Sequence, residues 1–251
     1  MTKNNPITGS SYLLRGIQYL PKPGIRSFVI IPLLINLVLF GSAIYLLFSN
    51  FSDWVQWLID LWLPDWEWLS FLEYLLWPLL AFLVVIGVYY GFSLVANFVA
   101  APFNGLLAEK VEQAVRGQVN SNLDSWKAIV KLIPAALARE FAKLAYYLPR
   151  LFVLFVLSFV PLVNLFMPFV WFAFAAWMMA IQYCDYPMDN NRVSFKQMRL
   201  LLSQRRWSAL GFGSLVQLGM LIPLLNLILM PAAVIGATLF WVEQYTNDPQ
   251  I

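Results

Sequence analysis

Residues 27–109 form a run of 83 positions that contains no Lys or Arg. Inside this run, the stretch from Phe28 to Phe48 carries no charged residue at all and begins just after Arg26. A helix over residues 28–50 rises about 33 Å, which is enough to cross a hydrocarbon core about 30 Å thick. The sequence therefore predicts a first membrane span at 28–50.

Composition agrees with a membrane location for the whole chain. Hydrophobic residues make up 61% and charged residues only 12%, whereas a soluble domain carries about 25% charged residues. The single cysteine, Cys184, excludes an internal disulfide, and the absence of histidine removes the commonest metal ligand and the usual proton relay. No nucleotide-binding loop, metal cluster or Ser/His/Asp arrangement is recognisable. We expect no enzyme activity, catalytic residue, cofactor, metal or nucleic-acid partner.

The first half of the chain divides into segments of different character. Residues 1–27 are mixed in polarity and contain a short helix, around Tyr12 to Leu20, expected to lie at the membrane interface. Residues 51–73 carry five acidic residues, no base and five Trp, which is typical of a loop at headgroup depth. A Trp-lined ligand cage is the less favoured alternative. A second span is expected at 74–101 and basic amphipathic helices at 102–150.

A basic stripe marks the helix expected between Asp124 and Leu148. Its members recur at multiples of four positions, and apolar residues occupy the opposite side; they are Lys127, Lys131, Arg139 and Lys143. Such a stripe indicates docking on anionic lipid or, alternatively, the cationic wall of an anion vestibule.

Two later stretches resemble each other. Residues 151–183 and 209–241 are each 33 residues long without a charged residue, and each is interrupted near its middle by Pro, Asn and Pro. Two full crossings need about 40 residues, and two prolines would disrupt one straight span. We therefore expect two re-entrant hairpins of half-helices, each about 15–20 Å long. Asn164 and Asn226 fall at the two tips, where each caps a half-helix or lines a polar path.

The distribution of charge favours this arrangement. The linker 184–208 carries five basic residues, and returning hairpins place all 16 basic residues of the chain on one side of the membrane. The predicted fold is an all-α integral membrane protein in a single membrane domain, 1–251. It has two full transmembrane helices, two re-entrant helical hairpins that penetrate the membrane partway, and amphipathic helices on the cytoplasmic side.

Pro23-Gly24-Ile25-Arg26-Ser27 stands where the charged N-terminal segment meets the first span. Gly24 allows a tight turn, Ser27 is suited to cap the following helix, and a helix N-terminus attracts anions. Arg26 adds a fork of donors that fits a tetrahedral oxyanion. The alternative is that Arg26 only anchors the helix among lipid headgroups.

The uncharged stretches contain no carboxylate for intramembrane proton coupling. What remains is a chain with cationic groups and helix N-termini on one face, which suits an anion pathway. Candidate pathway residues are Asn97, Asn104, Glu109, Arg139, Glu140, Arg150, Asn164 and Asn226. Helix caps and interhelical polar pairs are the alternative roles for each of them.

Several blocks of the chain resemble the CysZ family of bacterial inner-membrane sulfate permeases. Together they run from residue 23 to residue 227: Pro23-Gly24-Ile25-Arg26, Phe28 to Leu34, Ala101 to Glu109, Tyr147-Leu148-Pro149-Arg150, Ala180 to Pro187, Asp189-Asn190 and Ile222 to Leu227.

The resemblance implies sulfate uptake across the bacterial inner membrane for cysteine biosynthesis, without an ATPase subunit. It assigns sulfate binding to a Gly-Leu/Ile-Arg motif, here Gly24, Ile25 and Arg26, with Ser27 where the family commonly has a second arginine. It also implies a homo-oligomer that includes antiparallel pairs. The alternative function is a membrane interaction protein that modulates another transporter and carries nothing itself.

Overall fold

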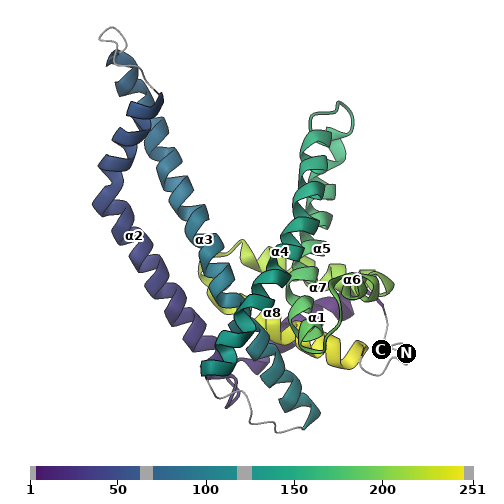
Figure 1. Ribbon diagram of the computed structural model, residues 1–251. Helices are drawn as coiled ribbons and strands as arrows, with labels where there is room; N and C mark the ends of the chain where they lie inside the picture. Colours follow the sequence, from purple (N-terminus) through teal and green to yellow (C-terminus); the bar gives the residue numbers. More distant parts are fainter. Residues whose placement is uncertain (1–3, 63–69, 118–125, 246–251) are drawn as a thin grey trace. The chain divides into compact units, whose positions relative to one another are not determined.

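The computed structural model describes residues 4–62, 70–117 and 126–245 (Figure 1). Its elements are the helices α1 (Pro6–Tyr19), α2 (Arg26–Trp62), α3 (Ser70–Arg116), α4 (Trp126–Leu157), η2 (Asn164–Phe166), α5 (Met167–Asn190), α6 (Phe195–Gln204), α7 (Arg206–Met220) and α8 (Pro223–Gln244). No strand occurs in the described ranges, which confirms the predicted all-α class. The chain forms two compact units, one of residues 1–31 with 101–251 and one of residues 32–100.

Unit 2, residues 32–100, is an antiparallel pair of helices. Val55 and Ile59 of α2 and Ala81 and Val84 of α3 form its small buried cluster. Helix α2 has 37 residues and continues past the expected end at residue 50 as far as Trp62, because no Gly or Pro interrupts residues 51–62. The expected acidic loop 51–73 is therefore helical over much of its length, and its residues 63–69 lie outside the described part of the chain.

Helix α3 is also longer than the sequence indicated. It has 47 residues and runs through the expected second span, 74–101, and through the Pro102–Gly105 block where that span was expected to stop. One proline removes a single backbone hydrogen bond. Here the backbone stays helical because Ala101, Pro102 and Phe103 are buried in unit 1.

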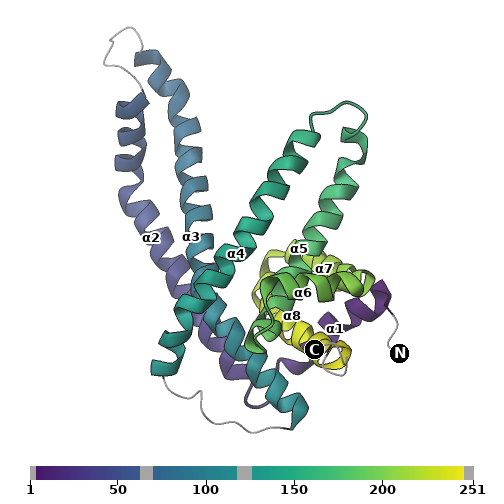
Figure 2. The ribbon, with the colours of Figure 1, turned by 45° about the vertical axis from the view of Figure 1, so that its right-hand side comes forward.

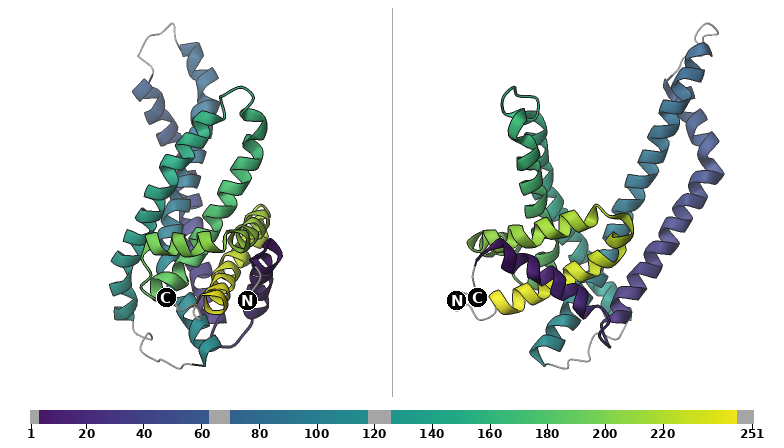
Figure 3. Two further views of the ribbon diagram at one scale, coloured as in Figure 1. Left: turned by 90° about the vertical axis from the view of Figure 1, so that its right-hand side faces the viewer. Right: turned by 180° about the vertical axis from the view of Figure 1, so that it is seen from behind.

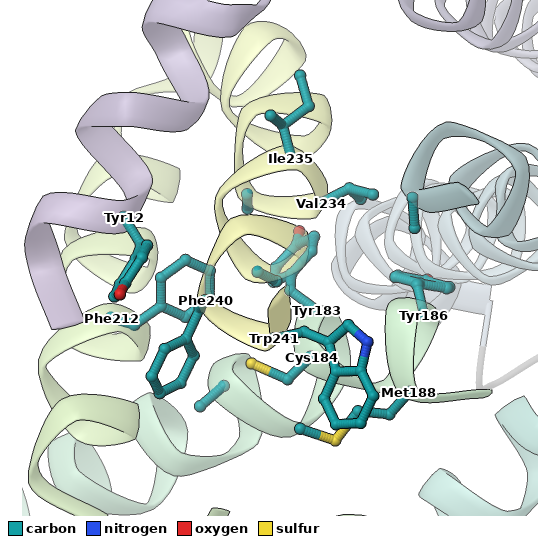
Figure 4. Close-up of a cluster of buried hydrophobic side chains, with 14 of the residues drawn as sticks. Tyr12, Tyr183, Cys184, Tyr186, Met188, Phe212, Val234, Ile235, Phe240 and Trp241 are labelled. Atoms are coloured by element: carbon teal, nitrogen blue, oxygen red, sulfur yellow. The ribbon is translucent and has the colours of Figure 1, made fainter. Parts of the chain in front are cut away.

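The core of unit 1 is built around α8. Residues 232–241 of this helix are all buried, and Thr238 is the only polar residue among them. A helix that is apolar on every side is buried on every side. Figure 4 shows its Val234, Ile235, Phe240 and Trp241 among side chains of the neighbouring helices. The ring of Tyr12 lies 5.1 Å from that of Phe240, so α1 belongs to this core.

The helices of the core approach one another through glycines. A Cβ added at Gly16 of α1 would overlap the backbone of α8 at Ala232, and one added at Gly213 of α7 would overlap the backbone of α5 at Ala176. Figure 3 shows α1 beside α7 and α8; Gly16 permits the close contact with α8, and Gly9, which faces Ser208, permits the one with α7. The predicted N-terminal helix is confirmed, but one side of it is core rather than interface.

A helical hairpin lies in each of the two similar stretches for which a hairpin was expected. In the first, α4 and α5 are antiparallel and extend away from α6 and α7 (Figure 2); Leu162, at φ 68°, lies in its turn. In the second, α7 and α8 meet at Leu221 and Ile222. The limbs exceed the expected 15–20 Å, since α5 has 24 residues and α8 has 22, or about 33–36 Å of helix. The helices simply continue beyond the uncharged stretches.

The two asparagines do not cap the hairpin tips. Asn164 begins the short η2 helix, and the N-cap of α5 is Phe166. The N-cap of α8 is Ile222, so Asn226 lies inside the helix, and its side chain is outside the structural description. Pro168 and Pro223 occupy the first turns of α5 and α8, where a missing N–H costs little.

By length and apolar composition alone, two helices among the described residues could cross a membrane. They are Leu37–Leu61 and Asn164–Asn190. The first overlaps the expected span 28–50. The second is the returning limb of the hairpin 151–183. In the expected span 74–101, only the shorter helix Trp77–Val88 is apolar enough among the described residues.

An ion pair ties α1 to the end of α8. Arg15 binds both carboxylate oxygens of Glu243, at 2.8 and 2.5 Å, and Tyr12 donates to the same carboxylate. The hydrogen bond from Arg15 holds the pKa of Glu243 below its usual value of 4.5. The pair therefore stabilises the fold above that value and is lost as the pH falls through the lowered pKa.

We expect the melting temperature of wild type to fall more steeply below about pH 4.5 than that of Glu243→Gln. The effect is small because about a third of each side chain is exposed. Parallel melting curves of the two proteins between pH 3 and pH 7, by circular dichroism, test this. Curves that fall together would contradict it.

Candidate functional site

A cavity of about 660 Å³ lies within unit 1, between the last four turns of α3, the middle of α4 and the end of α5. Its walls combine polar and apolar surface in similar proportion. Five acidic and four basic residues line it: Glu109, Glu112, Glu140, Asp185, Asp189, Arg116, Arg139, Lys143 and Arg192. The described lining thus carries one more negative than positive formal charge.

Asp185 is the centre of the ion pairs on one wall. Its side chain is 1% exposed and contacts Arg139 at 2.8 Å and Lys143 at 3.4 Å. Arg139 also reaches Asp189 at 3.5 Å, and Lys143 reaches Glu140 at 2.6 Å. Each base on this wall therefore has a carboxylate partner, as buried charges require.

This pairing turns the basic stripe of α4 inward. Lys143 is 3% exposed, whereas Phe141 on the same helix is 60% exposed and Leu148 is 53% exposed. The expectation that the stripe docks on lipid is wrong for Arg139 and Lys143, because the acidic residues of α5 bind them. The side chains of Lys127 and Lys131 lie outside the described part of the chain.

Neutral side chains join the three walls. Tyr186 donates to Glu140 at 3.3 Å and lies 3.4 Å from the amide of Asn104. Asn190 donates to the carbonyl of Gly105 at 2.7 Å, and Asn191 donates to Glu112 at 2.8 Å. These bonds hold the end of α5 against α3 on one side and α4 on the other.

Four of the eight predicted pathway residues come together here. Glu109, Arg139 and Glu140 line the cavity, and Asn104 binds Tyr186 in its wall. Burial raises the pKa of Glu109 above its usual value. Every one of them makes the interhelical or intrahelical polar contact that was the alternative to a pathway role.

The other four pathway residues lie elsewhere or cannot be placed. Arg150 stacks on Tyr146, and Asn164 is exposed at the hairpin turn. Asn97 and Asn226 lie in α3 and α8, but their side chains are outside the structural description.

Sequence reasoning did not select the central residue of the cavity, Asp185, and identified its partner Lys143 only as a member of the basic stripe. A signal was present, since Asp185 directly follows a long stretch without charge and Lys143 is one turn from Arg139. An acid next to so much apolar sequence needs a base within reach.

The Gly24 motif forms a turn at the start of α2. Gly24 has φ 83°, in the left-handed region that favours glycine. Ile25 is 3% exposed and belongs to the core of unit 1, which fixes the turn in place. The N–H groups of Ile25 and Arg26 both point to the carbonyl of Lys22, at 3.2 and 3.4 Å.

Arg26 is the first residue of α2, so Ser27 lies in the first turn and is not the N-cap that the sequence suggested. Both side chains are exposed, and among the described residues Arg26 has no hydrogen-bonding or ionic partner for its guanidinium. Of the four motif residues, none lines the cavity described above. Among the described residues, the motif presents an unpaired guanidinium at a helix N-terminus, whereas Arg116, Arg139 and Lys143 of the cavity are each paired with a carboxylate.

Comparison with known proteins decides the family. Residues 12–231 match the family described as "Sulfate transporter CysZ/Etoposide-induced protein 2.4". The chain belongs to this family. The CysZ resemblance inferred from the sequence blocks is thereby confirmed.

Curated CysZ relatives match along nearly their full length. "Sulfate transporter CysZ" of Pseudomonas fluorescens (strain Pf0-1) is 50% identical over 238 residues, 95% of this chain and 94% of the relative. The protein of the same name in Pseudomonas aeruginosa (strain LESB58) is 49% identical over 238 residues, 95% of this chain and 96% of the relative. That of Vibrio parahaemolyticus is 49% identical over 247 residues, 98% of both chains.

Proposed function

We propose that this chain carries sulfate across the bacterial inner membrane, as a channel or facilitator-like permease that supplies sulfur for cysteine biosynthesis. The observation that supports this most is the near full-length similarity to proteins named sulfate transporters. Long apolar helices support the membrane location. The lack of charge in both hairpin stretches supports their partial insertion, beside two full spans.

Sulfate binds, in this proposal, at Gly24, Ile25, Arg26 and Ser27. The turn at Gly24 brings exposed backbone to the start of α2, where the helix dipole favours an anion. The guanidinium of Arg26 and the hydroxyl of Ser27 add donors. Sulfate has no proton to donate near neutral pH, so a site made of donors suits it. Hydrogen phosphate carries a proton that such a site leaves unpaired, which selects against it.

We expect Arg26→Ala to weaken sulfate binding by about 10- to 100-fold, which corresponds to the loss of at least one charge-assisted hydrogen bond. Binding of labelled sulfate to the purified protein and uptake into proteoliposomes both measure this. Arg206→Ala is the matched control, because Arg206 is also an exposed arginine that begins a helix. Equal binding by wild type and Arg26→Ala would remove the site from this motif. Ser27→Arg restores the arginine common in the family and is expected to tighten binding.

The membrane arrangement has its own test. Single cysteines at positions 60, 120 and 200, in a background in which Cys184 is replaced by Ser, report which side each residue faces. Two spans and two returning hairpins predict that 120 and 200 are labelled from one side and 60 from the other. Labelling of 60 and 200 from one side, with 120 on the other, would contradict the hairpins.

The family resemblance also leads us to propose a homo-oligomer, with antiparallel pairs of protomers. In such an assembly the labelling test reports both orientations at each position. It therefore distinguishes the two arrangements only in protein whose protomers all share one orientation.

A further inference from the structure

Two arginines from different helices stack on one tyrosine at the base of the α4–α5 hairpin. The guanidinium carbon of Arg150, on α4, lies 3.6 Å from the centre of the Tyr146 ring. That of Arg199, on α6, lies 4.6 Å from the same ring and 5.0 Å from the ring of Phe195. The planar groups are held by aromatic faces, which leaves their N–H edges available.

The charges of these two arginines are not neutralised within the described part of the chain. Arg150 donates only to a neutral group, the carbonyl of Tyr146, at 2.7 Å. Arg199 has a buried Nε–H without an acceptor. Arg139, which also approaches Phe195, differs because it is bound to Asp185 and Asp189. An unpaired buried N–H costs free energy, and two cations held at one aromatic ring without a carboxylate favour an anion nearby.

The position of the pair indicates which anion. Arg150 is the last charged residue before the uncharged stretch 151–183. The helix turns that follow expose Phe152, Val153 and Phe155, each more than half exposed. Trp177 on the facing limb directs its Nε1 to the hydroxyl of Tyr146, at 3.4 Å. Tyr and Trp beside a step from charged to apolar surface are typical of headgroup depth in a bilayer.

We propose that Arg150 and Arg199, positioned by Tyr146, bind the phosphate of an anionic phospholipid headgroup. The acyl chains of this lipid lie along the exposed apolar face of the α4–α5 hairpin. A tetrahedral oxyanion accepts hydrogen bonds from the terminal N–H groups of both guanidinium forks. This site rests on insertion of the hairpin into the bilayer, which is part of the proposed function, but it does not depend on sulfate transport.

Titration of delipidated protein in detergent tests the site, with binding followed by native mass spectrometry. Phosphatidylglycerol is the anionic probe and phosphatidylcholine the zwitterionic one. We expect Arg150→Gln/Arg199→Gln to weaken phosphatidylglycerol binding by about 30-fold, as for two arginines at an anionic surface. Lys196→Gln/Arg206→Gln also removes two exposed positive charges, from α6 and α7, and is expected to bind as wild type does.

A further variant and a second anion separate the remaining explanations. Arg150→Lys/Arg199→Lys keeps both charges and is expected to bind more weakly than wild type and more tightly than the Gln pair. Its comparison with wild type tests the site even if the Gln pair folds poorly. Equal losses in both Gln pairs, or no loss in the Arg150/Arg199 pair, would overturn the proposal. Inorganic sulfate that competes for this site in lipid-free protein, and loses binding in the Arg pair variant, would make it a free-anion site instead.

Discussion

Asp185→Asn is expected to destabilise the protein by about 3–5 kcal/mol, the cost of removing one partner from a buried ion pair. Asp185 is 1% exposed and faces Arg139 at 2.8 Å and Lys143 at 3.4 Å. The neutral amide leaves two nearly buried cations with one carboxylate fewer. In a chain of this size the loss corresponds to a fall in melting temperature of roughly 6–20 °C.

Asp189→Asn is the matched control for this prediction. Asp189 is the same residue type one turn later on α5 and contacts the same arginine, but at 3.5 Å and with 42% of its side chain exposed. Its loss is expected to cost less than about 1 kcal/mol. Thermal melts of the detergent-solubilised proteins, followed by size-exclusion chromatography, compare the two. A second replacement, Lys143→Met, is expected to recover part of the stability of Asp185→Asn. Equal melting of the two single variants would show that Asp185 does not hold the cavity wall together.

Gly213→Ala is expected to cost about 3 kcal/mol, because the added methyl group meets backbone rather than a movable side chain. The new Cβ would overlap the carbonyl of Ala176, and the amide of Ala180 is also within reach. Helices α5 and α7 cannot separate at this point without opening the core that both share with α8. The change therefore lowers the free energy of unfolding, and the same thermal melts measure it.

The opposite sign is expected for Gly41→Ala in unit 2. Gly41 lies in α2 with nothing within 4 Å of an added Cβ, and alanine is favoured over glycine in a helix interior by about 1 kcal/mol. Comparing the stabilities of Gly213→Ala and Gly41→Ala separates the effect of close packing from that of helix propensity. Stabilisation or neutrality at Gly213 would mean that α5 and α7 are not in the close contact that the structure describes.

The sequence predicted the parts of this fold that depend on local composition. Long uncharged stretches are helical, and each of the two similar stretches contains one turn between two helices. In the second stretch, however, Asn226 and Pro231 lie inside α8 and the turn precedes them. Helix ends were less predictable. Pro102 and Gly105 resemble a stop signal but lie within α3, because tertiary burial of this segment compensates for one lost hydrogen bond. Likewise, α2 continues to Trp62, because a Trp-rich acidic segment can form a helix as well as a loop.

The candidate site was only partly predictable, for a physical reason. Glu109, Arg139 and Glu140 were selected as polar residues in a membrane protein, and they do line one cavity. Whether a basic residue faces lipid or a partner helix depends on which acid lies opposite it. Asp185 is 46 positions away from Arg139 in the chain, so periodicity within α4 carries no information about their pairing.

The measurement that tests the central proposal most directly is sulfate uptake by the purified wild-type chain alone in proteoliposomes. We expect saturable uptake of labelled sulfate above that of protein-free liposomes, reduced by unlabelled sulfate and not by an equal concentration of phosphate. A monodisperse protein with a cooperative melt that takes up no sulfate would contradict the proposal. That result would instead favour a membrane protein that modulates another transporter.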